Sequence, residues 1–302
     1  MKRNQLGNSD LHVSEIGLGC MSLGTEEAPA VRIILEALER GVNFLDTADL
    51  YDDGRNEEIV GKAIKGRRTE VVLATKVGNR RVPGQEGWVW DPSKEYILTA
   101  VKDSLRRLGT DYIDLCQLHG GTIEDPIDET IEAFEQLKKE GWIRHYGISS
   151  IRPNVIREYV ARSHIVSVMG QYSMLDRRPE EEVLPLLREH GIGFIARGPV
   201  AKGILTDEGE NKLGDGYLDY SRDELAAVRK ELLALTGEAR TLGQFALRYV
   251  LDAPGVTVAI PGASSLQQLL QNIAAAEAPP LTEEERKAVQ AVTKANQYDA
   301  HR

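Results

Sequence analysis

Cysteine is scarce in this 302-residue chain, which contains two, Cys20 and Cys116. Both lie in apolar, strand-like runs, so we expect buried thiols and a reducing compartment rather than a disulfide framework. The chain also lacks an apolar run of the ~18 residues that a membrane span requires, and its first ten residues do not resemble a signal peptide. We therefore expect a cytoplasmic protein without a membrane partner.

Positive charge is in deficit as well. The chain has 37 Lys and Arg against 47 Asp and Glu, a formal net charge of −10. Because phosphate backbones are bound by basic faces, we expect no nucleic-acid partner, although a local basic pocket for a small phosphate ligand is compatible with this charge. The six histidines are scattered without partners at metal-ligand spacing, so no metal site is predicted.

The chain has no linker rich in Pro, Gly or Ser, so a single domain is predicted over residues 1–302. Short apolar runs alternate with amphipathic helical stretches, which is typical of βα units. The predicted strands are Glu15–Gly19, Asn43–Leu45, Val71–Thr75, Ile113–Leu118, Arg144–Ile148, Ile165–Gly170, Gly193–Ala196 and Thr257–Ile260. Eight such units predict an α/β fold, a closed (β/α)8 TIM barrel, with a doubly wound sheet as the structural alternative.

Four segments lie outside this repeat. Lys2–Val13 is predicted to form an N-terminal hairpin, and Thr282–Ala295 an extra, capped C-terminal helix. Gly78–Pro92 and Leu205–Tyr220 are predicted to be long irregular loops. Both follow predicted strands, which would place them on the catalytic face of a barrel, where long loops are usually functional.

Polar residues follow three successive predicted strands. Asp46 and Tyr51 follow the second strand, Lys76 the third and His119 the fourth. In a barrel these positions converge on the active-site mouth, so we expect the four side chains to form one catalytic group.

These residue types suit the reduction of a carbonyl group. The hydride must come from a cofactor, and Tyr51 can give the proton because a phenol keeps its proton at neutral pH. A neighbouring Lys76 cation would lower the tyrosine pKa, Asp46 would hold the lysine, and His119 would hydrogen-bond the carbonyl.

Each residue alone has another explanation. Asp46 could cap a turn, Tyr51 could be a rim aromatic, and His119 could be a structural hydrogen bonder. Lys76 could form the Schiff base of an aldolase-like barrel, although a neighbouring Asp46 would oppose its deprotonation. The coincidence of all four at adjacent strand ends favours the reductase interpretation.

With these residues the chain resembles the aldo-keto reductases over nearly its whole length, in the bacterial general-type branch related to potassium-channel β-subunits. The segments that carry the resemblance are IGLGCMSLG, GVNFLDTADLYDDGRNEEIVGKAI, VVLATKVG, SLRRLGTDYIDLCQLHG, IRHYGISS and IPGASSLQQLLQN. The resemblance implies a barrel that binds NADP(H) or NAD(H) without a Rossmann domain, and no GxGxxG follows a predicted strand here. The family's catalytic tetrad corresponds to Asp46, Tyr51, Lys76 and His119.

The resemblance also implies a set of cofactor contacts. They are Gly19, Cys20, Met21, Asp46, Ser149, Ser150, Gln171, Arg197, Gly198, Pro199, Val200, Lys202, Gly203, Arg222, Gly262, Ser264, Gln268, Gln271 and Asn272. The pyrophosphate is expected along Gly198–Gly203 and the adenosine end along Gly262–Asn272, where a helix N-terminus favours phosphate.

Three positions depart from the common family pattern. Ser150 replaces an Asn, and Arg197 replaces the aromatic residue that stacks on the nicotinamide; a guanidinium can stack, but its charge would lie beside a ring that becomes cationic on oxidation. Gln268 replaces an Arg that grips the 2′-phosphate. Arg222, in a Tyr-Ser-Arg motif shared with the channel subunits, is the predicted substitute unless it is a solvated charge that starts a helix. NADP(H) is favoured, with NAD(H) as the alternative.

The substrate is predicted to be a small carbonyl compound. The predicted pocket residues are Met21, Tyr51, Trp88, Trp90 and His119, with Tyr172 and Met174 in the same wall. Trp88 and Trp90 could instead anchor their own loop by packing. Small aldehydes, ketoaldehydes and aromatic aldehydes are all compatible, and the sequence does not specify an oligomeric state. The alternative function is an NADP(H)-binding redox sensor or regulatory subunit with little turnover, motivated by Arg197 and Gln268.

Overall fold

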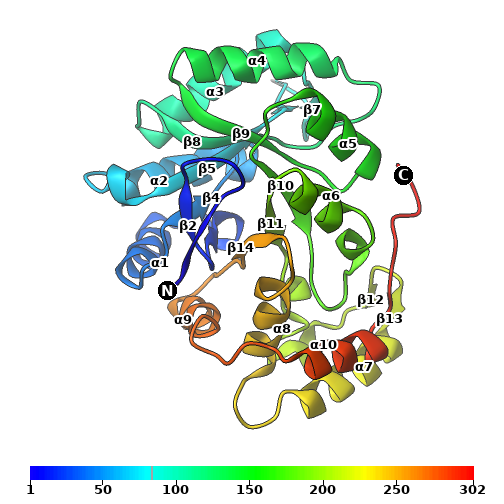
Figure 1. Ribbon diagram of the computed structural model, residues 1–302. Helices are drawn as coiled ribbons and strands as arrows, with labels where there is room; N and C mark the ends of the chain where they lie inside the picture. Colours follow the sequence, from blue (N-terminus) through cyan, green and yellow to red (C-terminus); the bar gives the residue numbers. More distant parts are fainter. Residues whose placement is uncertain (83) are drawn as a thin grey trace.

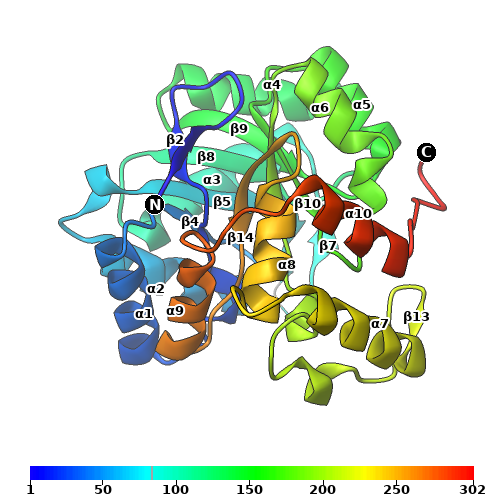
Figure 2. The same cartoon turned by 60° about the horizontal axis from the view of Figure 1, so that its bottom comes forward.

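The computed structural model describes residues 1–82 and 84–302. Its central sheet has eight parallel strands in the order β14-β11-β10-β9-β8-β5-β4-β3. The strands are β3 (Leu18–Gly19), β4 (Phe44–Asp46), β5 (Val72–Val77), β8 (Ile113–Leu118), β9 (Ile143–Ser149), β10 (Ser167–Gln171), β11 (Gly193–Arg197) and β14 (Val256–Ile260). Parallel bridges from Ile16 to Ala259 and from Gly19 to Gly262 close the sheet. The fold is therefore a (β/α)8 barrel (Figures 1 and 2), and the doubly wound alternative is wrong.

Helices surround the barrel (Figure 1). They are α1 (Glu27–Glu39), α2 (Arg55–Ile64), α3 (Lys94–Leu108), α4 (Ile127–Lys139), α5 (Pro153–Arg162), α6 (Val183–Glu189), α7 (Arg222–Leu235), α8 (Leu242–Leu251), α9 (Leu266–Ala274) and α10 (Glu283–Val292). Their buried faces follow the helical period; in α1, for example, Ala30, Ile33, Ile34 and Ala37 are buried. These faces pack on the outside of the sheet to form the larger hydrophobic core.

A smaller core fills the inside of the barrel. It joins Phe44 and Leu115 of the sheet to Leu6, Leu11 and Val13 of the N-terminal hairpin. The hairpin pairs β1 (Arg3–Gln5) with β2 (His12–Ser14), as the sequence predicts. Its apolar side chains close the end of the barrel where the strands begin, which leaves the opposite end for the site.

The C-terminal additions match their prediction, whereas the two long loops are more regular than expected. Thr282 caps α10 through a capping box, and α10 packs on α7 (Figure 2). The loop after β5 contains the paired strands β6 (Asn79–Arg80) and β7 (Val89–Trp90). The loop after β11 contains β12 (Gly216–Tyr217) paired with β13 (Tyr220–Ser221).

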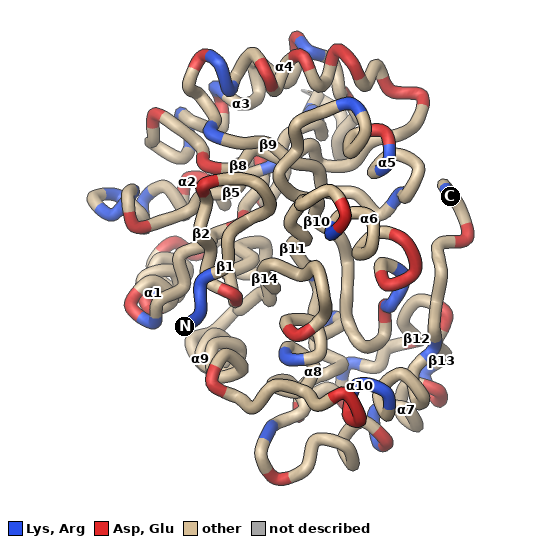
Figure 3. Tube along the Cα trace, viewed as in Figure 1, with Lys and Arg blue, Asp and Glu red and all other residues tan. Residues whose placement is uncertain are grey.

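Acidic and basic residues are interspersed around the outer helices (Figure 3). In this view Lys and Arg do not form a single basic patch, which is consistent with the net charge of −10. None of the helices formed by the described residues is long and apolar enough to cross a membrane.

Candidate active site

A cavity of about 970 Å³ opens where the barrel strands end. Its walls include the residues that follow β3, β4, β5, β8, β9, β10, β11 and β14, together with both long loops. Such a volume lies at the upper end of the range for small-molecule sites, which is roughly 300–1,000 Å³. The cavity therefore has room for more than a small carbonyl compound.

The predicted catalytic side chains meet at one end of this cavity. Lys76 Nζ lies 2.7 Å from Asp46 Oδ2, 2.8 Å from the Thr47 carbonyl oxygen and 3.0 Å from Tyr51 Oη. An ammonium group has three N–H donors, and each has a partner here. Lys76 is 1% exposed, so these contacts offset the cost of burying its charge.

The pKa values follow from burial and from these neighbours. Burial raises the pKa of Tyr51, and Lys76 opposes that shift without cancelling it. The expected effect of the lysine is therefore present, but burial outweighs it. Burial disfavours the Lys76 cation, yet Asp46 and Tyr51 together raise its pKa. The lysine stays charged, which argues against a Schiff-base nucleophile.

His119 is held neutral beside this group. Burial, with the charges of Lys76 and Arg197, lowers its pKa to about 3. Its ring lies edge-on to Tyr51, with centroids 6.0 Å apart. Nδ1 is buried and has no partner among the described residues. An unpaired acceptor is tolerated better than an unpaired N–H, so the proton belongs on Nε2, which leaves that nitrogen as a donor.

The backbone after β4 turns sharply to present Tyr51. Asp52, Asp53 and Gly54 all have positive φ, at 48°, 56° and 84°. Gly54 precedes α2 at its N-terminal cap, and its left-handed φ is a conformation that favours glycine. The tight turn places the Tyr51 ring over Lys76 Nζ.

Buried residues of α2 support the strands that carry the site, a role the sequence reasoning did not assign. Glu57 accepts hydrogen bonds from Thr75 at 2.6 Å and from Arg107 at 2.7 Å. Asn56 accepts from Thr47 at 2.7 Å and donates to the Cys20 carbonyl at 2.9 Å. Both lie in the RNEEIVG segment, and they fall on the buried side of the helix. Polar residues at such positions indicate a structural role, and this was the signal that the sequence offered.

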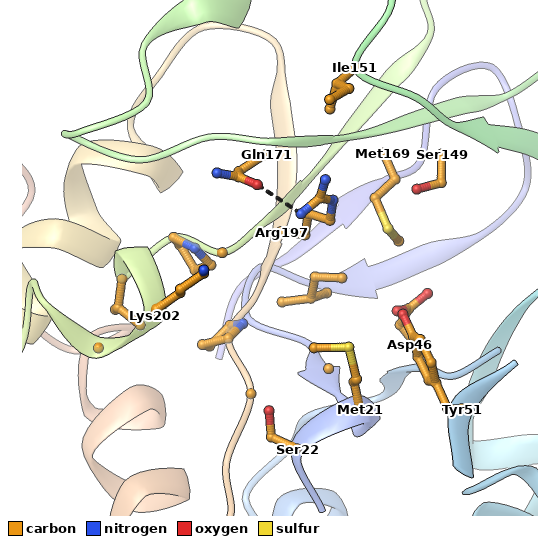
Figure 4. Close-up of a pocket in the computed structure, with 18 of the residues that line it drawn as sticks. Met21, Ser22, Asp46, Tyr51, Ser149, Ile151, Met169, Gln171, Arg197 and Lys202 are labelled. Carbon is orange, nitrogen blue, oxygen red and sulfur yellow. Dashed lines mark hydrogen bonds between the residues drawn. The ribbon is translucent and has the colours of Figure 1, made fainter. Parts of the chain in front are cut away.

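Most predicted cofactor contacts line the cavity. They are Gly19, Met21, Asp46, Ser149, Ser150, Gln171, Arg197, Gly198, Pro199, Val200, Lys202, Gly203, Gly262, Ser264, Gln268, Gln271 and Asn272. Figure 4 shows Arg197 joined to Gln171 by a hydrogen bond of 2.9 Å. At the far end, the Ser264 N–H and hydroxyl both donate to Gln268 Oε1, at 2.9 and 3.0 Å.

Four predicted residues lie elsewhere. Cys20 is fully buried and absent from the cavity wall, and its thiol donates to the Leu18 carbonyl oxygen at 3.6 Å. Arg222 is exposed at the first position of α7, outside the cavity lining. Tyr172 and Met174 are fully buried behind the wall rather than in it.

The predicted substrate residues Met21, Tyr51, Trp88, Trp90 and His119 all line the cavity. The two tryptophans differ in their setting. Trp90 donates to Asp125 at 3.0 Å and packs against Gly78 and Gly120, so it anchors its loop. Trp88 is 51% exposed at the mouth of the cavity, which leaves its ring free to meet a substrate.

The site fits a nicotinamide dinucleotide by its donors and its length. Arg197 and Lys202 bring positive charge to the wall of an otherwise acidic protein (Figure 4). The cavity extends from Tyr51 to the N-terminus of α9, where backbone and hydroxyl donors converge. Donors spread over this distance suit a long, anionic ligand.

Comparison with known proteins identifies the class. Residues 15–294 match the Aldo/keto reductase family, so the chain belongs to that family. It is 60% identical to "Uncharacterized oxidoreductase YqkF" of Bacillus subtilis (strain 168), covering 100% of both chains. It is 33% identical to "Probable aldo-keto reductase 1" of Glycine max, covering 90% of this chain and 83% of that protein.

Solved structures agree. The chain is similar to the holo form of aldo-keto reductase AKR11C1 from Bacillus halodurans, with a TM-score of 0.94 and 60% identity, covering 100% of this chain and 99% of that one. The apo form of the same protein gives a TM-score of 0.86 at 56% identity, again covering 100% and 99%. As a member of this family, with oxidoreductases among its relatives, the protein is a carbonyl-reducing oxidoreductase.

Proposed function

We propose that the protein reduces aldehydes or ketones to alcohols with NADP(H), and that Tyr51 is the proton donor. The observation that carries this proposal is the contact of Lys76 Nζ with both Asp46 and the Tyr51 hydroxyl. It places a paired cation against the Tyr51 phenol, which lines the cavity together with His119.

In the proposed reaction, each residue of the catalytic group has a separate role. The dihydronicotinamide, when bound, supplies the hydride to the carbonyl carbon. His119 Nε2–H donates a hydrogen bond to the carbonyl oxygen and orients it. Tyr51 transfers its proton to that oxygen as the C–O double bond becomes single, and the Lys76 cation stabilises the phenolate that remains. Burial, with the charges of Lys76 and Arg197, keeps His119 neutral, and a neutral imidazole is a much weaker acid than an imidazolium, which supports Tyr51 as the proton donor.

NADP(H) is the proposed cofactor, with NAD(H) as the alternative. In support, the Ser264 donors at the start of α9 meet at a single oxygen, that of Gln268, which a phosphate oxygen could replace. Arg222 is exposed and lies outside the cavity lining in this structure, so the Ser264 donors support this assignment more directly than Arg222 does. The closer likeness to the holo form of the Bacillus halodurans relative supports a cavity shaped for a cofactor.

Titration with NADPH and with NADH, followed by a panel of aldehydes, tests the proposal. Tighter binding of NADPH with turnover of several aldehydes is expected. Tighter binding of NADH would correct the cofactor. Tight binding without turnover would favour the alternative function, a redox sensor or regulatory subunit. The complete catalytic group argues against that alternative.

A further inference from the structure

A chain of hydrogen bonds leads from the cavity wall to the long loop after β11. Arg197 Nη1 donates to Gln171 Oε1 at 2.9 Å, and Gln171 Nε2 donates to Tyr217 Oη at 2.8 Å. Tyr217 also lines the cavity, although no catalytic or binding role follows for it from the chemistry above. Figure 4 shows the first link of this chain.

The strands set two of the three residues side by side. Gln171 and Arg197 are the last residues of β10 and β11 and are direct partners in the parallel register. A glutamine side chain has several rotatable bonds, so a single contact leaves it mobile. With Arg197 at its oxygen and Tyr217 at its nitrogen, the Gln171 amide is held at both ends.

Tyr217 is itself fixed from outside the cavity. It pairs with Tyr220 across a two-residue turn in which Leu218 has a φ of 53°. The C-terminal tail holds this turn, since Asn296 donates to Asp219 at 3.0 Å. Tyr217 is 7% exposed, and burial, with a contribution from Asp176, raises its pKa to about 12, so its hydroxyl keeps its proton.

The charge at the other end of the chain acts on the active site. Arg197 lines the same cavity as Asp46, Tyr51 and His119. Burial raises the pKa of Asp46 and of Tyr51, and the Arg197 charge opposes both shifts, so its guanidinium lies within electrostatic reach of the catalytic group. A nicotinamide ring in this region is neutral when reduced and cationic when oxidised. A fixed guanidinium nearby therefore disfavours the oxidised form.

We propose that Tyr217 is a positioning residue: through Gln171 it fixes the Arg197 guanidinium beside the nicotinamide site and so sets how strongly the protein prefers reduced over oxidised cofactor. This inference rests on the proposed function, because it requires a nicotinamide cofactor. If so, the loop after β11 contributes to discrimination between reduced and oxidised cofactor in addition to lining the cavity.

Equilibrium titration of tryptophan fluorescence with NADP⁺ and NADPH tests it without turnover. Tyr217→Phe removes only the hydroxyl and should tighten NADP⁺ relative to NADPH by about threefold to tenfold, the effect of losing roughly one hydrogen bond. Arg197→Met should shift the ratio of the two Kd values in the same direction. The double variant should match Arg197→Met, because the tyrosine acts through the arginine.

Tyr220→Phe is the matched control. Its hydroxyl, in the same hairpin, accepts from the Lys294 N–H at 2.5 Å and lies outside the cavity lining, so this variant should leave the ratio unchanged. An equal shift in Tyr220→Phe, an unchanged ratio in Tyr217→Phe, or additive effects in the double variant would overturn the inference. If the wild type binds both forms and Arg197→Met leaves the ratio unchanged, the inference fails and the cofactor assignment stands. If the wild type binds neither form, both fail.

Discussion

Lys76 decides the chemistry at the scale of single residues. Its three N–H groups are taken by Asp46, Thr47 and Tyr51, so the cation has one stable position. A lysine in that state is a fixed charge rather than a nucleophile. His119 is kept neutral by burial and by the charges of Lys76 and Arg197. In the proposed mechanism it donates a hydrogen bond, while Tyr51 gives the proton.

The neutral state of His119 predicts an acid sensitivity of folding. Its pKa lies near 3 in the folded protein, below its ordinary value of 6.5, so only the unfolded chain gains this proton as the pH falls from 6.5 towards 3. Stability must decrease over that range, by up to about 1.4 kcal/mol per pH unit from this residue. Urea unfolding of wild type and His119→Asn at pH 6, 5 and 4 measures the difference. Parallel decreases in the two proteins would contradict the buried neutral imidazole, and His12→Asn, at an exposed site, is the control.

Side-chain direction explains which site residues the sequence could predict. Asp46, Lys76 and His119 were recognisable because the ends of barrel strands converge, whatever the details of packing. Cys20, in the turn after β3, is absent from the cavity lining although its neighbours Gly19 and Met21 are part of it, because a motif alone does not say which residues of a turn face the cavity. The roles of Asn56, Glu57 and Tyr217 depend on their contacts with other segments; the helical pattern marks Asn56 and Glu57 as polar residues on a buried face but does not name their partners.

At the scale of elements, one end of the barrel contributes to stability and the other end carries the site. At the end where the strands begin, Asp114 of β8 accepts hydrogen bonds from Arg68 and from Arg144, each at 2.7 Å, and from the Leu73 N–H at 2.9 Å. These contacts tie β5, β8 and β9 together. The proposed catalytic residues lie at or just beyond the opposite ends of the strands, so this clamp should affect stability alone.

Asp114→Ala should therefore lower the free energy of unfolding by about 3 kcal/mol, since the buried carboxylate leaves two arginines without their partner. The Kd for NADPH should change by less than about twofold. Chemical unfolding and cofactor titration measure the two quantities. Asp103→Ala breaks an exposed ion pair with Arg106 and serves as the control, with an expected loss of under about 0.5 kcal/mol. A large change in cofactor affinity in Asp114→Ala would contradict the separation of duties.

The regular elements were predictable and the small hairpins were not. Strands such as Val256–Ile260, with the sequence VTVAI, are almost continuous apolar runs, as expected for a barrel strand that is buried on both faces. The pairs β6–β7 and β12–β13 have two residues in each strand, too few to show an alternating pattern. Their pairing arises from the loops' positions over the barrel.

At the scale of the whole molecule, positive charge is concentrated by the cavity rather than by the surface. The protein carries a net charge of −10, yet Lys76, Arg152, Arg197, Lys202 and Lys212 all line one cavity. An anionic cofactor should therefore bind the folded chain only, because the unfolded chain does not bring these residues together.

Binding should consequently stabilise the fold. NADPH at 100 times its Kd is expected to raise the free energy of unfolding by about 2.7 kcal/mol, which thermal unfolding would record as a rise of several degrees. Tyr51→Phe should show the same rise, since the phenol oxygen serves proton transfer rather than cofactor binding. An unchanged melting temperature at saturating NADPH would argue against a preformed site.

The most direct test of the account is the turnover of Tyr51→Phe. The variant keeps the ring and loses the proton, so we predict that NADPH binds within about twofold of wild type while kcat for aldehyde reduction falls by roughly 10²–10⁴-fold. Retention of more than about a tenth of the wild-type rate would show that another group donates the proton.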